Sequence, residues 1–489
     1  MGASDKIRPF RWTDTEDDDR ADAKAAFDRL STLNGYAEPF SLFAGEPLRI
    51  KAARKPSSNL FQRKVHVKSI AIRDAVGEAV LWTRALQPPL RVKSELPQSY
   101  RDQGANYQCT LDIETAGLPP GLYECILKDD AGDQSQDIYF NIKPKTVESI
   151  ELLCVLPTFT WHAYCRVGGG SFYSANIGGL RSVSLHRPMS RKSDNAANAS
   201  LNFLRTFAEA KIAYACVDST DLHEGTLPQG TAPVMALLTH DEYWSRPMRA
   251  TIDDYLDRSG VLLVMAGNVC WWQIEVDAGS ITVDKTPTKR MPYWHARGLP
   301  EERTFLSSFR FGGYALNRAM RKPFVARHVS SLTPEKIQAA GGVDVVMPDH
   351  PLFQGVVLGA DNTFGSEVPV LYREIDGIPL DDDGNVDRNW YDADDIEPRI
   401  IATGLAVNNL RYNPISRVGV IAEGHVRNGH VLHLGSFGWS LGLGQDNAAV
   451  RRLVLNAVAY CRDLRPETPQ RKRRGRRGRR RSDKFDGLA

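Results

Sequence analysis

The run His240 to Ser245 carries most of the side chains in this chain that could do chemistry together. It reads His-Asp-Glu-Tyr-Trp-Ser and directly follows Val234 to Leu238, an apolar stretch that predicts a buried strand. Ionisable groups at the end of such a strand are costly unless they meet water, one another or a metal. The oxygens of Glu242 and Tyr243 are hard donors of the kind ferric iron prefers. A structural role, in which Asp241 caps the following helix, is the alternative.

A second group of candidate residues follows the apolar run Ser149 to Leu156. Aromatic and histidine side chains between Trp161 and Tyr164 are followed by a glycine-rich loop from Gly168 to Tyr173. Loops at the carboxyl ends of strands are where open α/β sheets bind ligands, and the glycines would let backbone N–H groups approach an anion. A tight, aromatic-lined loop without chemistry explains the same residues.

Cys270 is the candidate for nucleophilic catalysis. It follows the predicted strand Val261 to Ala266, at the kind of strand-to-helix turn where a nucleophile is presented. Its neighbours Val269 and Trp271 are bulky, whereas a sharp turn favours small residues. The seven cysteines are scattered without CxxC spacing, which favours reduced and mostly buried thiols over disulfides or a zinc site. A structural thiol is therefore the competing interpretation of Cys270.

Glu374 and Asp376 form a pair of carboxylates two residues apart. Side chains at this spacing face the same way from a strand, which would suit metal ligation or acid–base catalysis. An exposed acidic turn is equally compatible with the pattern, and the nearby run Asp381 to Gly384 is expected to be one.

The segments that must position these groups alternate between strand and helix from residue 146 to 463. Buried strands are expected at Ile212 to Val217 and in the runs named above, and helices at Asn202 to Ala210 and Met248 to Arg258. This alternation predicts an α/β domain with a doubly wound parallel sheet. The remaining expected elements are strands Val418 to Ala422 and Gly429 to Leu434 and the helix Asn447 to Cys461.

The chain ahead of this domain has a different pattern. Residues 39 to 145 contain short β-type runs separated by turns such as Gly117 to Gly121, which predicts an antiparallel β-sandwich. Residues 1 to 38 are expected to be a lead segment with a short helix around Ala21 to Leu33. Residues 464 to 489 are expected to be a disordered basic tail.

The charge of the chain is concentrated in that tail. The formal net charge is +3, yet residues 465 to 489 hold eleven Lys or Arg against three Asp or Glu, so they contribute +8 and the rest of the chain −5. Arg471 to Arg481 would suit non-specific contact with nucleic acid or another acidic surface, or form a solvated tail. No apolar run approaches the roughly 20 residues of a membrane helix, and no signal peptide is visible. We therefore expect a cytoplasmic protein without membrane contact.

Taken in order, these motifs resemble the C-terminal domain of the N,N-dimethylformamidase large (beta) subunit family. The resemblance covers about 300 residues and is most specific at His240 to Ser245. Relatives tend to carry a β-sandwich ahead of this domain, as residues 39 to 145 would. The matching motifs are Trp161 and Tyr164 with the glycine loop, Ser184 to Pro188, His240 to Ser245, Gly267 to Gln273, Glu374 to Gly377 and Gly435 to Trp439.

The resemblance implies a sheet related to the class I glutamine amidotransferase fold. It also implies a mononuclear iron held by two tyrosines and one glutamate, which activates water against a small amide. Within the motifs, Tyr243 is the first tyrosine and Glu374 matches the glutamate best, with Glu367 in reserve.

The second tyrosine ligand is open. Trp271 stands in a stretch where a relative can carry tyrosine, and indole cannot ligate iron as phenolate does. Tyr293 is the expected substitute, and Tyr164 or Tyr173 are the alternatives.

The function expected from these residues is iron-dependent hydrolysis of a small amide or related C–N bond. His240, Glu242 and Asp241 would form the catalytic group, with the histidine or Glu242 moving the proton. The partners expected are an amide-like small molecule and either a second copy or a small subunit. A non-catalytic binding or scaffold protein with a nucleic-acid-binding tail is the main alternative, and amidotransferase chemistry at Cys270 is the third.

Overall fold

The structure is a computed structural model of the 489-residue chain, and everything below concerns the residues that it describes. These are residues 30–55, 65–93, 102–135, 137–168, 170–173, 180–189, 195–230, 233–270, 272–284, 341–365, 367–372, 375–376, 399–407, 414–426 and 428–464. The basic tail and most of the lead segment, together with Trp271, Tyr293 and Glu374, lie outside them.

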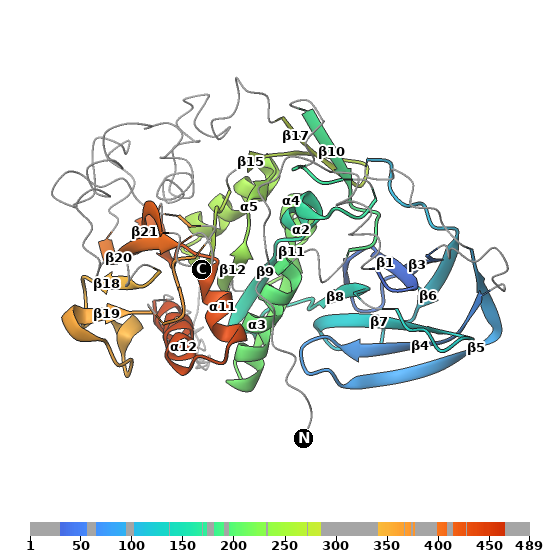
Figure 1. Cartoon of the computed structure of the whole chain (residues 1–489), viewed down its shortest axis with the longest axis horizontal. Helices are drawn as coiled ribbons and strands as arrows, with labels where there is room; N and C mark the ends of the chain where they lie inside the picture. The colour runs from blue at the N-terminus through green and yellow to red at the C-terminus, as the bar shows by residue number, and fades with distance from the viewer. Residues whose placement is uncertain are drawn as a thin grey trace, which may run out of the picture.

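Two small sheets in the N-terminal part share one apolar core (Figure 1). Side chains of Ile50, Ile70 and Leu127, from both sheets, are fully buried there, as expected where alternate residues of each strand face a common interior. The five-stranded sheet has the order β2 (Ser41–Phe43), β8 (Tyr139–Lys143), β7 (Gly121–Asp129), β4 (Val65–Asp74), β5 (Val80–Val92). The three-stranded sheet has the order β1 (Leu33–Glu38), β3 (Leu48–Arg54), β6 (Cys109–Ile113).

A nine-stranded sheet forms the centre of the rest of the chain. Neighbours from β11 to β22 pair in parallel, and neighbours from β22 to β19 pair antiparallel. The strand order is β11 (Tyr214–Asp218), β9 (Leu152–Leu156), β12 (Val234–His240), β14 (Val261–Gly267), β22 (Gly429–His433), β21 (Pro414–Val426), β20 (Arg399–Val407), β18 (Val343–Val345), β19 (Thr363–Phe364).

The prediction of a doubly wound parallel sheet, related to the class I glutamine amidotransferase fold, is therefore wrong. The sheet is mixed, and the chain is rich in antiparallel strands. The strands expected at 418–422 and 429–434 exist, but they are neighbours in an antiparallel hairpin in which Val426 pairs with Gly429. A parallel crossover needs about a dozen residues or more. The short connection between these two strands could only have produced a hairpin.

Helices cover both faces of this sheet, and alternate residues of β9 reach the two sides. Leu152 and Cys154 pack with α3 (Asn195–Glu209) and α12 (Ala448–Asp463) in one core cluster. Leu153 and Val155 pack in the other with the helices that follow β9, β11 and β12. Those helices are α2 (Thr158–Tyr164), α4 (Ser219–Glu224) and α5 (Arg246–Asp257), while α11 (Gly438–Gly444) precedes α12.

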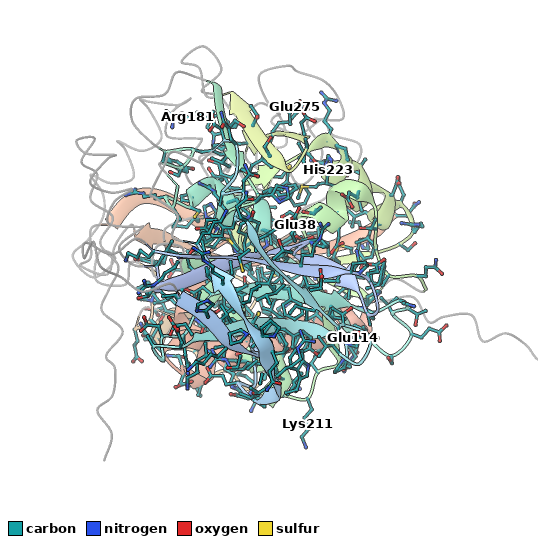
Figure 2. All side chains as sticks on the ribbon, turned by 90° about the vertical axis from the view of Figure 1, so that its right-hand side faces the viewer. Glu38, Glu114, Arg181, Lys211, His223 and Glu275 are labelled. Atoms are coloured by element: carbon teal, nitrogen blue, oxygen red, sulfur yellow. The ribbon has the colours of Figure 1, made fainter. Side chains whose placement is uncertain are left out.

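Short elements stand at the carboxyl end of the parallel strands. They are β13 (Tyr243–Trp244) with β15 (Trp272–Gln273), and the sheet of β10 (Leu180–Ser184), β17 (Ser280–Asp284) and β16 (Glu275–Asp277). Figure 2 shows Arg181 of β10 and Glu275 of β16 at one end of the molecule and Lys211, which precedes β11, at the opposite end. The 3-10 turns η4 (Pro351–Phe353) and η5 (Ala360–Asn362) lie in the antiparallel half. No helix in the described ranges is long and apolar enough to cross a membrane.

Candidate functional site

The ends of β12 and β14 bring two of the predicted motifs together. His240, the last residue of β12, pairs with Gly267, the last residue of β14. Beyond the strands the two segments stay side by side, because the N–H groups of Cys270 and Trp272 donate to the carbonyls of Asp241 and Glu242, both at 2.9 Å. The polar residues that follow β12 are therefore fixed by backbone hydrogen bonds to the segment that follows β14.

Three residues at these strand ends have left-handed backbone conformations. The φ angles are 67° at Thr239, 53° at Asn268 and 53° at Cys270. A β-branched residue such as threonine rarely adopts this region. Backbone strain persists only where the surrounding structure imposes it, and it is concentrated at functional sites.

Helix α2 supplies the third part of the site. The hydroxyl of Thr160 accepts hydrogen bonds from the backbone N–H groups of Glu242 at 3.0 Å and Tyr243 at 3.3 Å. Beyond the helix the chain turns back, and the N–H of Phe172 donates to the carbonyl of Ala163 at 2.8 Å. This turn brings Tyr173 next to Tyr164, with ring centroids 4.5 Å apart.

Three tyrosine hydroxyls and one carboxylate converge at this point. Tyr164 donates to Oε2 of Glu242 at 2.7 Å, and Tyr173 lies 3.0 and 2.9 Å from the two carboxylate oxygens. The hydroxyls of Tyr243 and Tyr164 are each 2.8 Å from that of Tyr173. The result is a compact cluster of hard oxygen donors, which we call the oxygen cluster.

His240 adjoins the oxygen cluster. Its Nε2 lies 3.3 Å from Oε2 of Glu242, and its ring meets that of Tyr164 edge-on at 5.1 Å. His240, Glu242 and Tyr243 are buried, whereas Tyr173 is 38% exposed. Burial of the hydroxyl, then the neighbouring Glu242 and Tyr164, raise the pKa of Tyr173 well above its usual value. The carboxylate of Glu242 thus lies beside the imidazole of His240, which can act as a base, and accepts hydrogen bonds from the neutral hydroxyls of Tyr164 and Tyr173.

Asp241 is placed differently from its two neighbours. Nε2 of His240 lies 3.3 Å from Oε2 of Glu242, whereas the carboxyl of Asp241, which stands between them in the sequence, is not part of the oxygen cluster. The Asp241 carboxyl is fully buried, and among the described residues neither oxygen has a hydrogen-bond partner. Burial raises the pKa of Asp241 to about 7, although the Trp244 indole and His240 act in the opposite direction. That indole donates its hydrogen bond to the backbone carbonyl of Asp241, at 3.0 Å.

The cap of helix α5 is Ser245 and not Asp241. The Ser245 hydroxyl accepts from the N–H of Met248 at 3.3 Å, and Pro247 occupies the first turn. The structural alternative for Asp241, as a helix cap, is thereby removed.

A buried arginine fixes the loop that carries Tyr173. Arg187 is fully buried, and its guanidinium donates to the carbonyls of Val167 at 2.9 Å, Gly170 at 3.0 Å and His162. A planar fork with five donors can bind several carbonyls at once, which lysine cannot. Arg187, in the stretch Ser184 to Pro188, thus joins the end of α2 to the loop beyond it, a role that no local sequence pattern indicated.

Asp376 lies at the same strand ends. Its Oδ2 accepts from the N–H of Val269 at 3.2 Å and is 3.3 Å from Nε2 of His433, and both side chains are buried. The sequence singled out Asp376 through its pairing with Glu374, but it missed His433. The signal for His433 was its place at the end of a strand, β22, beside β14.

The expected metal ligands are only partly described. Tyr243 belongs to the oxygen cluster, Glu374 and Tyr293 lie outside the described residues, and Glu367 is exposed. Within the described ranges, no group of three or more His, Cys, Asp or Glu is arranged to hold a metal ion. All seven cysteines are buried free thiols, as expected, and Cys270 is among them.

Comparison with known proteins identifies the relatives of the chain. A family model described as N,N-dimethylformamidase beta subunit-like, C-terminal, matches residues 64–450. The resemblance seen in the sequence motifs is thus confirmed, and the match begins within the β-sandwich strands. A search of curated proteins finds no match.

Proposed function

Because the chain belongs to the N,N-dimethylformamidase beta subunit-like family, we propose that it hydrolyses the C–N bond of a small amide with the help of a bound metal. The observation that carries the proposal is the oxygen cluster, in which the hydroxyls of Tyr164 and Tyr173 contact the carboxylate of Glu242 and the hydroxyl of Tyr243 contacts that of Tyr173. Its place beyond the carboxyl ends of parallel strands is where sheets of this kind bind ligands.

The residues present fit an iron ion. Phenol and carboxylate oxygens are hard donors suited to ferric iron, and the hydroxyl of Tyr243 already stands among them. Tyr243 and Glu374 would hold the metal, with Tyr293 as the second tyrosine or, in its place, Tyr173. When bound, such a metal polarises a carbonyl and lowers the pKa of a bound water.

The chain's own residues would handle the proton. Glu242 would accept it from the attacking water, because its carboxylate is oriented by Tyr164 and Tyr173. His240, at 3.3 Å from Glu242, would relay it towards the departing amine. Asp241 would act behind this pair through its effect on His240.

The first test is metal content and colour. The purified protein should contain iron and show phenolate-to-iron absorption in the visible range, which Tyr243→Phe should shift or remove. Tyr107→Phe is the matched control, since Tyr107 donates to Asn34 in the β-sandwich and lies outside the cluster. Metal-free protein with no visible band would refute the metal part of the proposal.

The second test is hydrolysis of N,N-dimethylformamide or formamide, measured by the release of the amine or ammonia. Glu242→Gln should lower kcat about 10²- to 10⁴-fold, the usual contribution of a general base. An unchanged kcat in this variant would exclude Glu242 as the base.

The family description includes the words beta subunit, so a small partner chain or a second copy of this chain is part of the proposal. Light scattering on the purified protein tests it. If amide hydrolysis and metal are both absent, the non-catalytic alternative gains support. Retention on nucleic acid at low salt, with and without residues 465–489, then tests that alternative.

A further inference from the structure

A buried ion pair connects the β-sandwich to the domain that carries the oxygen cluster. Lys143, at the end of β8, forms a salt bridge with Asp221 of α4, and both side chains are only 4% exposed. The same ammonium group donates to the carbonyl of Thr226 at 3.0 Å and lies 4.4 Å from the ring centroid of Phe43. Figure 1 shows β8 as the sandwich strand beside β11, the strand that leads to α4.

Asp221 shares its site with a second buried carboxylate. Asp218 caps α4 by accepting from the N–H of Asp221 at 3.0 Å, and the N–H of Asp218 returns a bond of 3.0 Å to the Asp221 carboxylate. Burial and then the charge of Asp221 raise the pKa of Asp218 well above its usual value. Within the described residues, Lys143 is the cation that forms a salt bridge with this pair.

The network continues to the oxygen cluster through α2. The hydroxyl of Thr158, the first residue of α2, donates to Asp218 at 2.9 Å. Two residues further on, Thr160 accepts the N–H groups of Glu242 and Tyr243. A series of buried contacts, with one step along helix α2, therefore runs from Lys143 of the sandwich to the backbone of Glu242 and Tyr243 in the oxygen cluster.

We propose that Lys143 is a positioning residue through which the β-sandwich sets the place of Glu242 and Tyr243. A buried carboxylate pair without its cation must protonate or move, and α4 and the start of α2 are attached to that pair. The inference that Lys143 fixes the backbone of Glu242 and Tyr243 rests on these contacts alone. Its effect on catalysis rests on the proposed function.

Hydrogen exchange of the Glu242 and Tyr243 amides tests the backbone part without any assay of activity. Lys143→Met removes the charge and keeps the apolar stem. Glu78→Gln is the matched control, because Glu78 also joins the sandwich to the main domain, through an exposed contact with Arg205 of 2.8 Å. We expect exchange of the two amides to rise at least about tenfold in Lys143→Met, after correction for global stability measured in urea, and not in Glu78→Gln.

Two further variants keep the test decisive. Thr160→Val removes the acceptor and should accelerate the same amides. Asp221→Asn in the Lys143→Met background restores charge balance and should return most of the protection. The proposal is overturned if the amides accelerate only in step with global unfolding, or equally in Glu78→Gln, or if the second substitution restores nothing.

Kinetics give the second readout. With N,N-dimethylformamide as the probe, Lys143→Met should lower kcat about 10- to 100-fold with little change in KM, the scale expected for a misplaced catalytic group. If the wild-type protein hydrolyses no amide, the proposed function fails, while the exchange result still decides whether Lys143 positions the cluster.

Discussion

Two buried carboxylates of the main domain, Glu423 within the nine-stranded sheet and Asp241 just beyond its strand β12, have opposite surroundings. Glu423 lies in β21, opposite Leu432 of β22, and accepts a hydrogen bond from the hydroxyl of Tyr460 at 2.7 Å. It also lies 3.2 Å from Nε2 of His430, 3.5 Å from Nε2 of His350, and in contact with Arg399. Asp241 follows the carboxyl end of β12, and neither of its oxygens has a hydrogen-bond partner in the part of the chain that the structure describes.

The contacts around Glu423 indicate a structural role. The Nδ1 of His350 accepts from the N–H of Leu352 at 3.1 Å, so its Nε2 carries a proton and points to Glu423. Because a metal binds histidine through a nitrogen lone pair, this protonated nitrogen is not available as a metal ligand. Although burial raises it, hydrogen bonds from His350, His430 and Tyr460 hold the pKa of Glu423 well below its usual range.

The difference teaches how to tell a structural from a functional charge in this molecule. Buried charges are expensive unless they are paired and hydrogen-bonded, and Glu423 satisfies that condition. Asp241 does not, and it adjoins strained backbone and the oxygen cluster. Uncompensated groups of this kind mark functional sites because catalysis requires a reactive group that is not neutralised.

The largest expected effect is loss of stability in Glu423→Gln. The variant leaves the surrounding donors without a carboxylate, which should cost about 3–5 kcal/mol in the free energy of unfolding. Urea unfolding at neutral pH measures it. A loss under about 1 kcal/mol would show that the neighbours rearrange and that the contrast with Asp241 is weak.

Asp241→Asn should instead raise the free energy of unfolding. It replaces an unsatisfied buried carboxyl by a neutral side chain of the same shape, so the protein should gain about 2 kcal/mol at pH 8. Its hydrolytic activity should fall at the same time. Destabilisation of the size expected for Glu423→Gln would mean that both carboxylates are structural.

The pH dependence of stability should distinguish the two carboxylates further. A carboxylate with a lowered folded pKa stabilises the protein above its usual pKa of 4.5, and this contribution is lost as the pH falls below it. The difference in unfolding free energy between wild type and Glu423→Gln should therefore be largest above about pH 5 and shrink towards pH 2. Chemical unfolding at several pH values measures it, and a constant difference would contradict the assignment.

The smallest effect is expected for Arg399→Gln. The Arg399 side chain is 55% exposed, so its ion pair with Glu423 is screened by water. The loss should be at most about 1 kcal/mol and should decline with added salt. A loss as large as that of Glu423→Gln would make Arg399, and not the histidines, the main partner.

Much of the local structure could be predicted from sequence. The strands expected at 234–238 and 261–266 are β12 and β14, and the motif that follows β12 lies at the strand end as expected. The antiparallel direction of β21 relative to β22 could also have been predicted, because the connection between the two strands is too short for a crossover.

Contacts between segments far apart in the chain could not be predicted from the sequence in the same way. Thr160 and Glu242 are 82 positions apart, and Lys143 and Asp221 are 78 apart. No local pattern gives such pairings, because they depend on how the whole chain packs. For the same reason Tyr164 and Tyr173 entered only as substitutes, although both hydroxyls meet Glu242.

Tyr173 is the exposed tyrosine of the oxygen cluster, with 38% of its surface open to solvent, while Tyr243 has none. Of these two rings, solvent therefore reaches that of Tyr173 and not that of Tyr243. A reagent that nitrates phenols should mark Tyr173 first, and occupancy of the cluster by a ligand should slow that labelling. The order in which the rings react would trace the route of entry without knowledge of the substrate.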